Sequence, residues 1–192
     1  ASKLAADKIF ISGNHLAANV KSRFSVVRYG NVIGSRGSIY WIIKNVIEKK
    51  LKKVPITDKR MTRFWITLDQ GVEFVLSSLD LMSGGEIYVP KIPSMKITDF
   101  INSFCSDKKL EEIGIRPGEK LHETMITKED SRYTYDCKDR YVIEPNIHQW
   151  DSERLKKNKI KGNKVQENFE YTSNLNKTWL TKKDLLSLEK FF

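Results

Sequence analysis

The sequence predicts an α/β protein with a mainly parallel sheet, because short apolar runs alternate with segments of helical periodicity. Residues 23–29 contain two adjacent valines and are typical of a buried strand. Residues 86–90 read as a second core strand, and between the two the apolar residues recur at helical spacing. The chain of 192 residues is long enough for one sizeable core.

The remaining elements follow from periodicity, capping residues and chain breakers. In the first half we expect a helix over 1–18, a helix capped by Ser38 and closed by lysines 49–53, an extended piece over 54–58, and a helix from Thr67 to Gly84. In the second half we expect a loop over 93–97, a helix capped by Thr98, a strand over 112–115, a helix with Leu121 and Met125, and a strand over 141–143. Residues 146–168 read as a loosely ordered polar segment, and Thr181 with Asp184 as a capping box of the last helix.

The charge balance raises the question of nucleic acid, since 34 basic residues against 24 acidic ones give a net charge of +10. The lysines gather at 49–53 and 156–164. Neither cluster carries the interleaved aromatic residues of a single-strand binder, so a solvated face explains them more simply. We therefore expect no nucleic-acid partner, and keep a basic nucleic-acid-binding domain as an alternative of another class.

Targeting and metal signals are missing from the sequence. No apolar run approaches the roughly 18 residues of a membrane span, and no signal segment opens the chain. Cys105 and Cys137 are isolated and typical of free thiols, which favours a cytoplasmic protein without a membrane partner. The histidines, at positions 15, 122 and 148, lie too far apart in sequence to suggest a metal site.

A glycine-bearing loop follows the first predicted strand. Gly30, Gly34 and Gly37 are interleaved with polar residues, so a ligand could approach the main chain closely. The carboxyl edge of a parallel sheet is where α/β proteins bind ligands. The alternative is a tight strand-to-helix connection in which the glycines serve geometry alone.

Several arginines lie beside glycine, proline, threonine or aromatic residues, and the planar guanidinium suits phosphate. We expect about half of them in internal ion pairs and the others at a ligand. They are Arg28, Arg36, Arg60, Arg63 and Arg116.

Five ordered blocks carry a family resemblance. They are Ser25–Val32, Pro55–Asp58, Arg60–Trp65, Lys91–Met95 and Ile115–Glu123. Together they closely resemble the extended short-chain dehydrogenase/reductase family, and within it the inverting UDP-N-acetylglucosamine 4,6-dehydratases that start pseudaminic acid synthesis.

The resemblance implies a Rossmann-like, doubly wound parallel sheet with a small substrate-binding subdomain, of which this chain is the C-terminal part. Residues 1–145 would belong to the NADP- and nucleotide-sugar-binding domain, and 146–192 would be a polar extension ending in a short helix. Ala1-Ser2-Lys3 is similar to the end of the family's Tyr-x-x-x-Lys pair. Lys3 would bind the nicotinamide ribose and lower the pKa of a tyrosine one residue before Ala1. Without that tyrosine, we expect the chain alone to be inactive.

The family's reaction is an internal redox cycle on a UDP-sugar. Hydride passes from C4 of the sugar to NADP, the C5 proton is lost and water leaves from C6. The hydride then returns to C6, and C5 is reprotonated on the opposite face. The resemblance also implies a homo-oligomer, with flagellin glycosylation or capsule assembly as the use of the product.

Residue by residue, the resemblance places Asn31, Thr57, Arg116 and Glu119 at the substrate, with Arg116 on the diphosphate and Glu119 on a ribose hydroxyl. Val32, Ile33, Gly34, Ser35 and Arg36 would line the cofactor together with Lys3. Arg60 and Arg63 would border the same pocket. Each has a plainer alternative: Lys3 as a surface lysine, Glu119 as a cap or a partner of Lys120, and Arg116 as a turn residue.

One departure affects the start of the helix after the glycine loop. Relatives tend to carry a proline after Gly37-Ser38, whereas this chain has Tyr40-Trp41. The sugar preference is therefore open at this stage, and a related 4,6-dehydratase/5-epimerase or a 4-epimerase is the nearest alternative.

Overall fold

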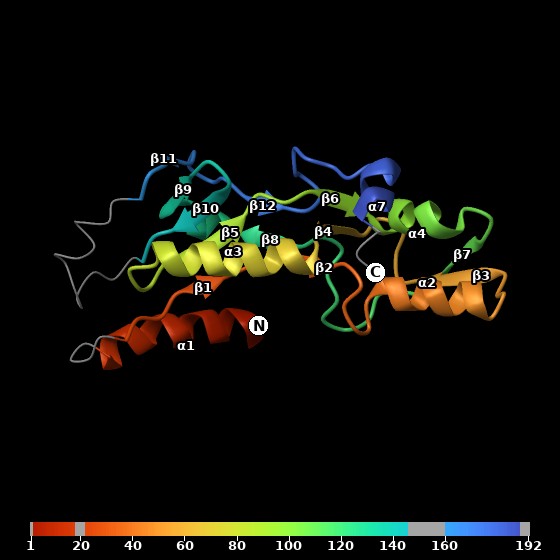
Figure 1. Ribbon diagram of the computed structural model, residues 1–192, viewed down its shortest axis with the longest axis horizontal. Coiled ribbons are helices and arrows are strands. Elements are labelled where there is room, and N and C mark those ends of the chain that lie inside the picture. The colour runs from red at the N-terminus through yellow and green to blue at the C-terminus, as the bar shows by residue number, and fades with distance from the viewer. Residues whose placement is uncertain (1, 18–21, 146–159, 189–192) are drawn as a thin grey trace. The chain divides into compact units, whose positions relative to one another are not determined.

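The structure is a computed structural model that describes residues 2–17, 22–145 and 160–188 (Figure 1). The chain divides into two compact units that interleave along the sequence. The first unit comprises Ala1–Tyr29, Val72–Lys91 and Met125–Glu170, and the second comprises Gly30–Gly71, Ile92–Thr124 and Tyr171–Phe192. The predicted boundary at residue 145 borders residues outside the described ranges and stays a prediction.

The first unit is built on a five-stranded sheet in the order β1-β5-β10-β9-β11. β1 is parallel to β5, and the other neighbours are antiparallel. The strands are β1 (Val26–Val27), β5 (Ile87–Pro90), β9 (Thr134–Asp136), β10 (Arg140–Ile143) and β11 (Asn163–Lys164). The helices are α1 (Ser2–Leu16), the short α5 (Lys128–Ser131) and most of α3 (Leu68–Leu81).

Helix α3 packs on this sheet through Phe74, which forms a buried cluster with Tyr88 of β5 and Val142 of β10. Helix α1 is fastened next to β1 by a buried asparagine. Asn14 donates to the Phe24 carbonyl and accepts from the Phe24 N–H, at 2.9 and 3.0 Å. The Phe24 carbonyl also accepts from the Gly85 N–H at 2.7 Å, so the main contribution of Asn14 is to give the Phe24 N–H an acceptor.

The second unit holds two small sheets. In one, β2 is parallel to β4 and β6 is antiparallel to β4; in the other, β3 is parallel to β7. The strands are β2 (Asn31–Val32), β3 (Lys53–Ile56), β4 (Thr62–Ile66), β6 (Ser94–Lys96), β7 (Lys109–Glu112) and β12 (Tyr171–Thr172). The helices are α2 (Ile39–Glu48), α4 (Ile97–Cys105) and α7 (Lys182–Leu188). β8 (Thr124–Ile126) begins at the last residue of this unit's middle segment.

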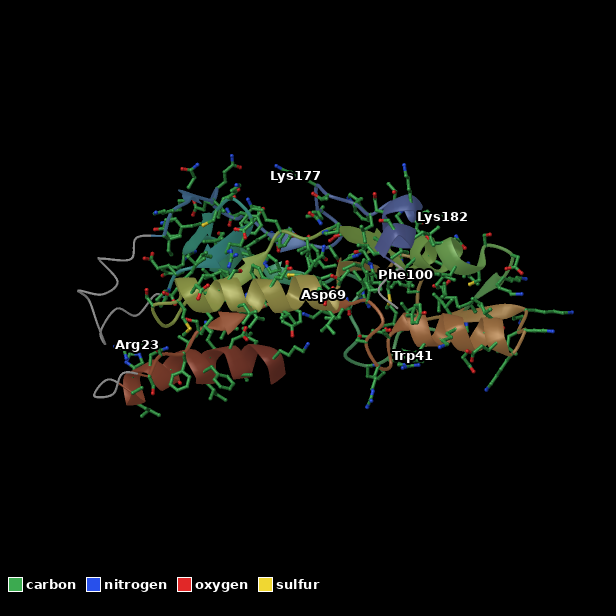
Figure 2. The ribbon with its side chains drawn as sticks, in the orientation of Figure 1. Arg23, Trp41, Asp69, Phe100, Lys177 and Lys182 are labelled. Carbon is green, nitrogen blue, oxygen red and sulfur yellow. The ribbon has the colours of Figure 1, made fainter. Side chains whose placement is uncertain are left out.

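The core of the second unit is aromatic and aliphatic. Phe100 of α4, labelled in Figure 2, is fully buried and stacks on Trp65 of β4 with ring centroids 4.3 Å apart. Ile43 and Val46 supply the buried face of α2, as their helical spacing predicts. Burying aromatic rings of this size is worth several kcal/mol by area alone, about 25 cal/mol per Å².

The predicted fold class is confirmed: the chain is α/β, with helices where periodicity places α1, α2, α3 and α7. Thr181 and Asp184 form the expected capping interaction of α7, since each accepts a hydrogen bond from the other's backbone N–H. The five-stranded sheet is mixed, whereas the alternation of strands and helices in the sequence predicts a mainly parallel sheet. The difference arises because β9, β10 and β11 join it through antiparallel pairings.

Several local predictions are wrong. The predicted loop over 93–97 contains β6, which pairs with β4. The residue in the N-cap position of α4 is Lys96 and not Thr98. The predicted helix with Leu121 and Met125 is absent from the described structure, where Thr124–Ile126 forms β8. The strand predicted over 112–115 lies earlier, over Lys109–Glu112, where it pairs with β3. Ser38 occupies the N-cap position of α2, but its side chain makes no capping hydrogen bond.

Gly30 allows β2 to lie against β4. A Cβ atom at this position would be 2.6 Å from the Phe64 Cβ and 2.7 Å from the Phe64 carbonyl oxygen. Neither atom is the end of a flexible side chain, so a larger residue must push the strands apart. The absence of a side chain at position 30 therefore permits the register that pairs Asn31 with Trp65.

We predict that Gly30→Ala lowers the free energy of unfolding by about 1–3 kcal/mol through overpacking. Gly71→Ala is the matched control, because a Cβ there meets nothing within 4 Å and the position is helical. It should stabilise the protein by about 0.5–1 kcal/mol. Urea unfolding of the two variants measures both values. Equal unfolding free energies for the two variants would contradict the close approach.

Candidate functional site

The predicted site residues are distributed between the two units. Lys3 lies in the first turn of α1, in the first unit, with its side chain exposed. All the other predicted site residues lie in the second unit. They are Asn31, Val32, Ile33, Gly34, Ser35, Arg36, Thr57, Arg116 and Glu119.

The glycine loop connects β2 to α2. Gly34 and Gly37 have φ values of +78° and +75°, a region that favours glycine, so these glycines are required by the backbone. Arg36 is exposed at the tip of the loop, and its guanidinium makes no ion pair or hydrogen bond with the described residues. Within the same described residues, the backbone N–H groups of Gly34, Arg36 and Gly37 donate no hydrogen bond.

The tryptophan that follows the loop bonds back to the loop. Trp41 of α2 is labelled in Figure 2, and its indole N–H donates to the Gly34 carbonyl at 3.1 Å. This bond ties the glycine loop to the first turn of α2. The Tyr40-Trp41 pair therefore has a structural consequence: the loop is held by a side chain from the helix.

Glu119 holds the loop that carries Arg116. Its carboxylate accepts from the Thr57 hydroxyl at 3.3 Å and from the Arg116 N–H at 3.4 Å. The structure thus brings three predicted substrate residues together. The Arg116 guanidinium is exposed and makes no ion pair among the described residues, so it is available to an anion.

Arg63 is the cation at the centre of the second unit's polar residues. Its side chain is 14% exposed, and its guanidinium donates to the carbonyls of Thr62, Lys120 and Leu121 at 2.8–3.0 Å. Two carboxylates lie just beyond hydrogen-bond distance, Glu119 at 4.0 Å and Glu123 at 3.9 Å. Arg63 therefore fixes the segment around Lys120 against β4 and places one positive charge near the two acids on it.

Glu123 connects Arg63 to Asn31. One carboxylate oxygen accepts from the Asn31 side-chain amide at 2.9 Å, and the other accepts from the Phe64 N–H at 3.1 Å. Asn31 also donates to the Phe64 carbonyl at 3.3 Å. Polar residues from four chain segments thus form one continuous series, which we call the polar chain: Thr57, Glu119, Arg63, Glu123 and Asn31.

No sequence motif assigned a role to Glu123. It lies in the same block as Arg116 and Glu119, four residues after the latter, and this spacing was the signal available. A buried polar group beside it was not predicted either: the Thr62 hydroxyl contacts Ser173 at 2.7 Å and His122 at 2.8 Å. Ser173 is fully buried and lies 111 residues from Thr62, so no local pattern could reveal the pair.

The remaining two of the five arginines have carboxylate partners. Arg28, in the first unit, donates to Asp7 of α1 and to Asp130 of α5 at 2.9 Å each, and to the Met125 carbonyl at 2.8 Å. Arg60 pairs with Asp58 at 2.7 Å. Arg28, Arg60 and Arg63 are thus used internally, which agrees with the expectation that about half of the arginines would be.

The described residues also bear on metal binding, membrane spanning and the pairing of the clustered lysines. They contain no group of three or more His, Cys, Asp or Glu placed to hold a metal ion. No helix within them is long and apolar enough to cross a membrane. In the first lysine cluster, Lys53 forms an exposed ion pair with Glu111 at 2.5 Å.

The architecture and the glycine loop at the end of β2 place the chain in the class of Rossmann-like α/β proteins. The solved structure titled "X-ray structure of Pen from Bacillus thuringiensis" is similar, with a TM-score of 0.81 and 27% identity over 99% of this chain and 56% of that one. The chain belongs to the family described as "Polysaccharide biosynthesis protein", whose model matches residues 1–145.

Curated relatives refine this placement. UDP-N-acetylglucosamine 4,6-dehydratases (inverting) of two Campylobacter jejuni strains are 49% identical over 191 residues, or 98% of this chain and 57% of theirs. A UDP-glucose 4-epimerase of Rickettsia bellii is 34% identical over 146 residues, or 74% of this chain and 42% of its own. The resemblance to the inverting dehydratases is therefore confirmed, and the chain spans little more than half of their length.

Asp58, next to Thr57, makes the folding stability of this region depend on pH. The side-chain and backbone hydrogen bonds from Arg60 lower the pKa of Asp58 from 3.8 to about 2. Because the folded-state pKa is depressed, this contribution to stability is present above about pH 4 and is lost as the pH falls toward 2.

We predict that Asp58→Asn flattens the fall in unfolding free energy between pH 4 and pH 2 and lowers stability at pH 7. Arg60→Gln removes the partner and should flatten the same window. Urea unfolding at a series of pH values measures the slopes. A wild-type slope in both variants would contradict the assignment.

Proposed function

We propose that this chain is part of an NADP-dependent dehydratase that converts UDP-N-acetylglucosamine to a 4-keto-6-deoxy sugar with inversion at C5. The observation that carries the proposal is the 49% identity, over 98% of the chain, with inverting dehydratases of that substrate. The polar chain supports it, because it joins the residues predicted for the nucleotide to the residue predicted for the sugar.

The substrate residues have distinct roles in this proposal. Arg116 would bind the diphosphate, since its guanidinium is exposed and unpaired within the described residues. Glu119 would accept a hydrogen bond from a ribose hydroxyl, because Thr57 and the Arg116 backbone already orient its carboxylate. Asn31, at the other end of the polar chain, would contact the sugar.

The glycine loop fits a dinucleotide. Its glycines leave no side chain over the backbone, three backbone N–H groups have no partner in the described structure, and Arg36 supplies a free cation. We propose that Val32–Arg36 line the cofactor and that Arg36 favours the phosphate of NADP. Lys3 would hold the nicotinamide ribose and keep a neighbouring tyrosine acidic. The bound nicotinamide would supply the reversible hydride acceptor that this reaction class needs.

We further propose that residues 1–145 form one functional domain and that the protein is a cytoplasmic homo-oligomer. Cys105 and Cys137 are both free thiols, which fits a reducing compartment. Light scattering on a size-exclusion column measures the oligomeric state directly.

The function is tested with protein expressed from the complete reading frame, incubated with UDP-N-acetylglucosamine in D₂O. We expect a 4-keto-6-deoxy product with one deuterium at C5 in the inverted configuration, observed by NMR, and turnover with NADP in preference to NAD. The similarity to a UDP-glucose 4-epimerase makes simple C4 inversion the second candidate. A 4-epimer without deuterium at C5 would replace the first proposal with the second.

Two arginine variants separate the proposed ligand sites. Arg116→Ala removes a charge-assisted contact of about 1.5–3 kcal/mol and should raise KM for the UDP-sugar about 10-fold or more, with KM for NADP unchanged. Arg36→Ala should raise KM for NADP and leave KM for the UDP-sugar unchanged. Each variant controls for the other, because both side chains are exposed and neither should alter folding. Steady-state kinetics with each ligand varied in turn gives the values, and an equal effect on both ligands would refute the assignment.

A further inference from the structure

Glu123 is held in place through both its backbone and its side chain. Its backbone N–H donates to the Ser173 hydroxyl at 2.9 Å, and its carbonyl accepts from the Ser173 N–H at 2.8 Å. Ser173 itself is fully buried. On the side chain, the Phe64 N–H and the Asn31 amide each donate to one carboxylate oxygen. The side chain is 29% exposed, so these contacts are partly shielded from water.

This arrangement determines which way the Asn31 amide points. Its Nδ2 group faces two acceptors, the Glu123 carboxylate at 2.9 Å and the Phe64 carbonyl at 3.3 Å. A flipped amide would place Oδ1 against both of them, acceptor against acceptor. Neither partner can become a donor, because a carbonyl and an ionised carboxylate have no hydrogen to give. Oδ1 accepts no hydrogen bond from the described residues.

We propose that Glu123 is a positioning residue that fixes the Asn31 amide so that Oδ1 is presented as a hydrogen-bond acceptor to a donor on the sugar of the bound nucleotide-sugar. This inference rests on the proposed function, which supplies the UDP-sugar. Asn31 then selects for a donor group, because an acceptor that the bound ligand covers without supplying a donor would cost affinity. Glu123 acts through Asn31 and touches no ligand itself.

Glu123→Gln is the sharpest single change. The backbone N–H of Phe64 cannot reverse, so the Gln carbonyl must face it and the Gln amino group must face Asn31. The Asn31 amide then flips so that its Oδ1 accepts from the Gln: it gives up the longer 3.3 Å bond to the Phe64 carbonyl to keep the shorter contact at position 123, and it presents N–H groups to the sugar's donor. We expect affinity for UDP-N-acetylglucosamine to fall about 10-fold, while affinity for UDP, which lacks the sugar, stays the same.

A compensating pair gives the proposal a second test. Asn31→Asp alone places two carboxylates against each other and should weaken sugar binding. In the double variant N31D/E123Q, the Gln amino group donates to one Asp oxygen and the other oxygen is again an acceptor for the sugar. Affinity for UDP-N-acetylglucosamine should return to within about 3-fold of wild type. Glu111→Gln, which changes an exposed carboxylate elsewhere in the second unit, should have no effect.

Isothermal titration of protein from the complete reading frame with UDP and with UDP-N-acetylglucosamine measures each affinity. A wild type that binds neither ligand defeats the proposed function. A wild type that binds both, with an unchanged affinity ratio in E123Q or no rescue in the double variant, defeats only this inference. If E123Q also loses UDP binding, the variant Asn31→Ala is tested in its place. For the inference to stand, Asn31→Ala must weaken binding of UDP-N-acetylglucosamine and leave binding of UDP unchanged.

Discussion

The second unit depends on one cation that is mostly shielded from solvent. Arg63 donates to three carbonyls within 3.0 Å and lies about 4 Å from two carboxylates. A guanidinium that is 14% exposed is costly to desolvate, and these contacts offset that cost. Because two of the carbonyls belong to Lys120 and Leu121, the segment that carries Glu119 and Glu123 is anchored to β4 by the same group that offsets part of its negative charge. A lysine could not replace Arg63, since an ammonium lacks the planar fork.

The arginines divide by what surrounds them, and this division locates the candidate binding residues better than arginine content does. Arg28 and Arg60 have carboxylate partners in the described structure, and Arg63 has carbonyls as well. Arg36 and Arg116 have none among the described residues and stand on loops that contain glycines at positive φ. A cation without an internal partner keeps its hydrogen-bonding capacity for an anionic ligand. The positive net charge is thus less informative than the position of these two side chains.

Sequence patterns predicted the elements that local physics controls. The apolar spacing of α2 and the pairing of Thr181 with Asp184 need only neighbouring residues, and both were recovered. β6 and β8 were missed because each is three residues long and its conformation comes from distant partners. The family blocks supplied the candidate site residues, whose roles stay predictions. They did not predict Glu123, because its contact with Asn31 spans 92 positions and no motif states which groups touch.

The polar chain has a consequence for how binding energy is used in the proposed reaction. The end proposed for the nucleotide, at Thr57 and Glu119, lies far in sequence from Asn31, the end proposed for the sugar. Both ends meet Arg63 through one carboxylate each. Energy from binding a remote, unreactive part of a substrate raises the rate only when it orients the reacting part. A rigid connection of charge-assisted contacts is suited to that purpose, because moving Glu119 without moving Glu123 would separate Arg63 from one of its two acids.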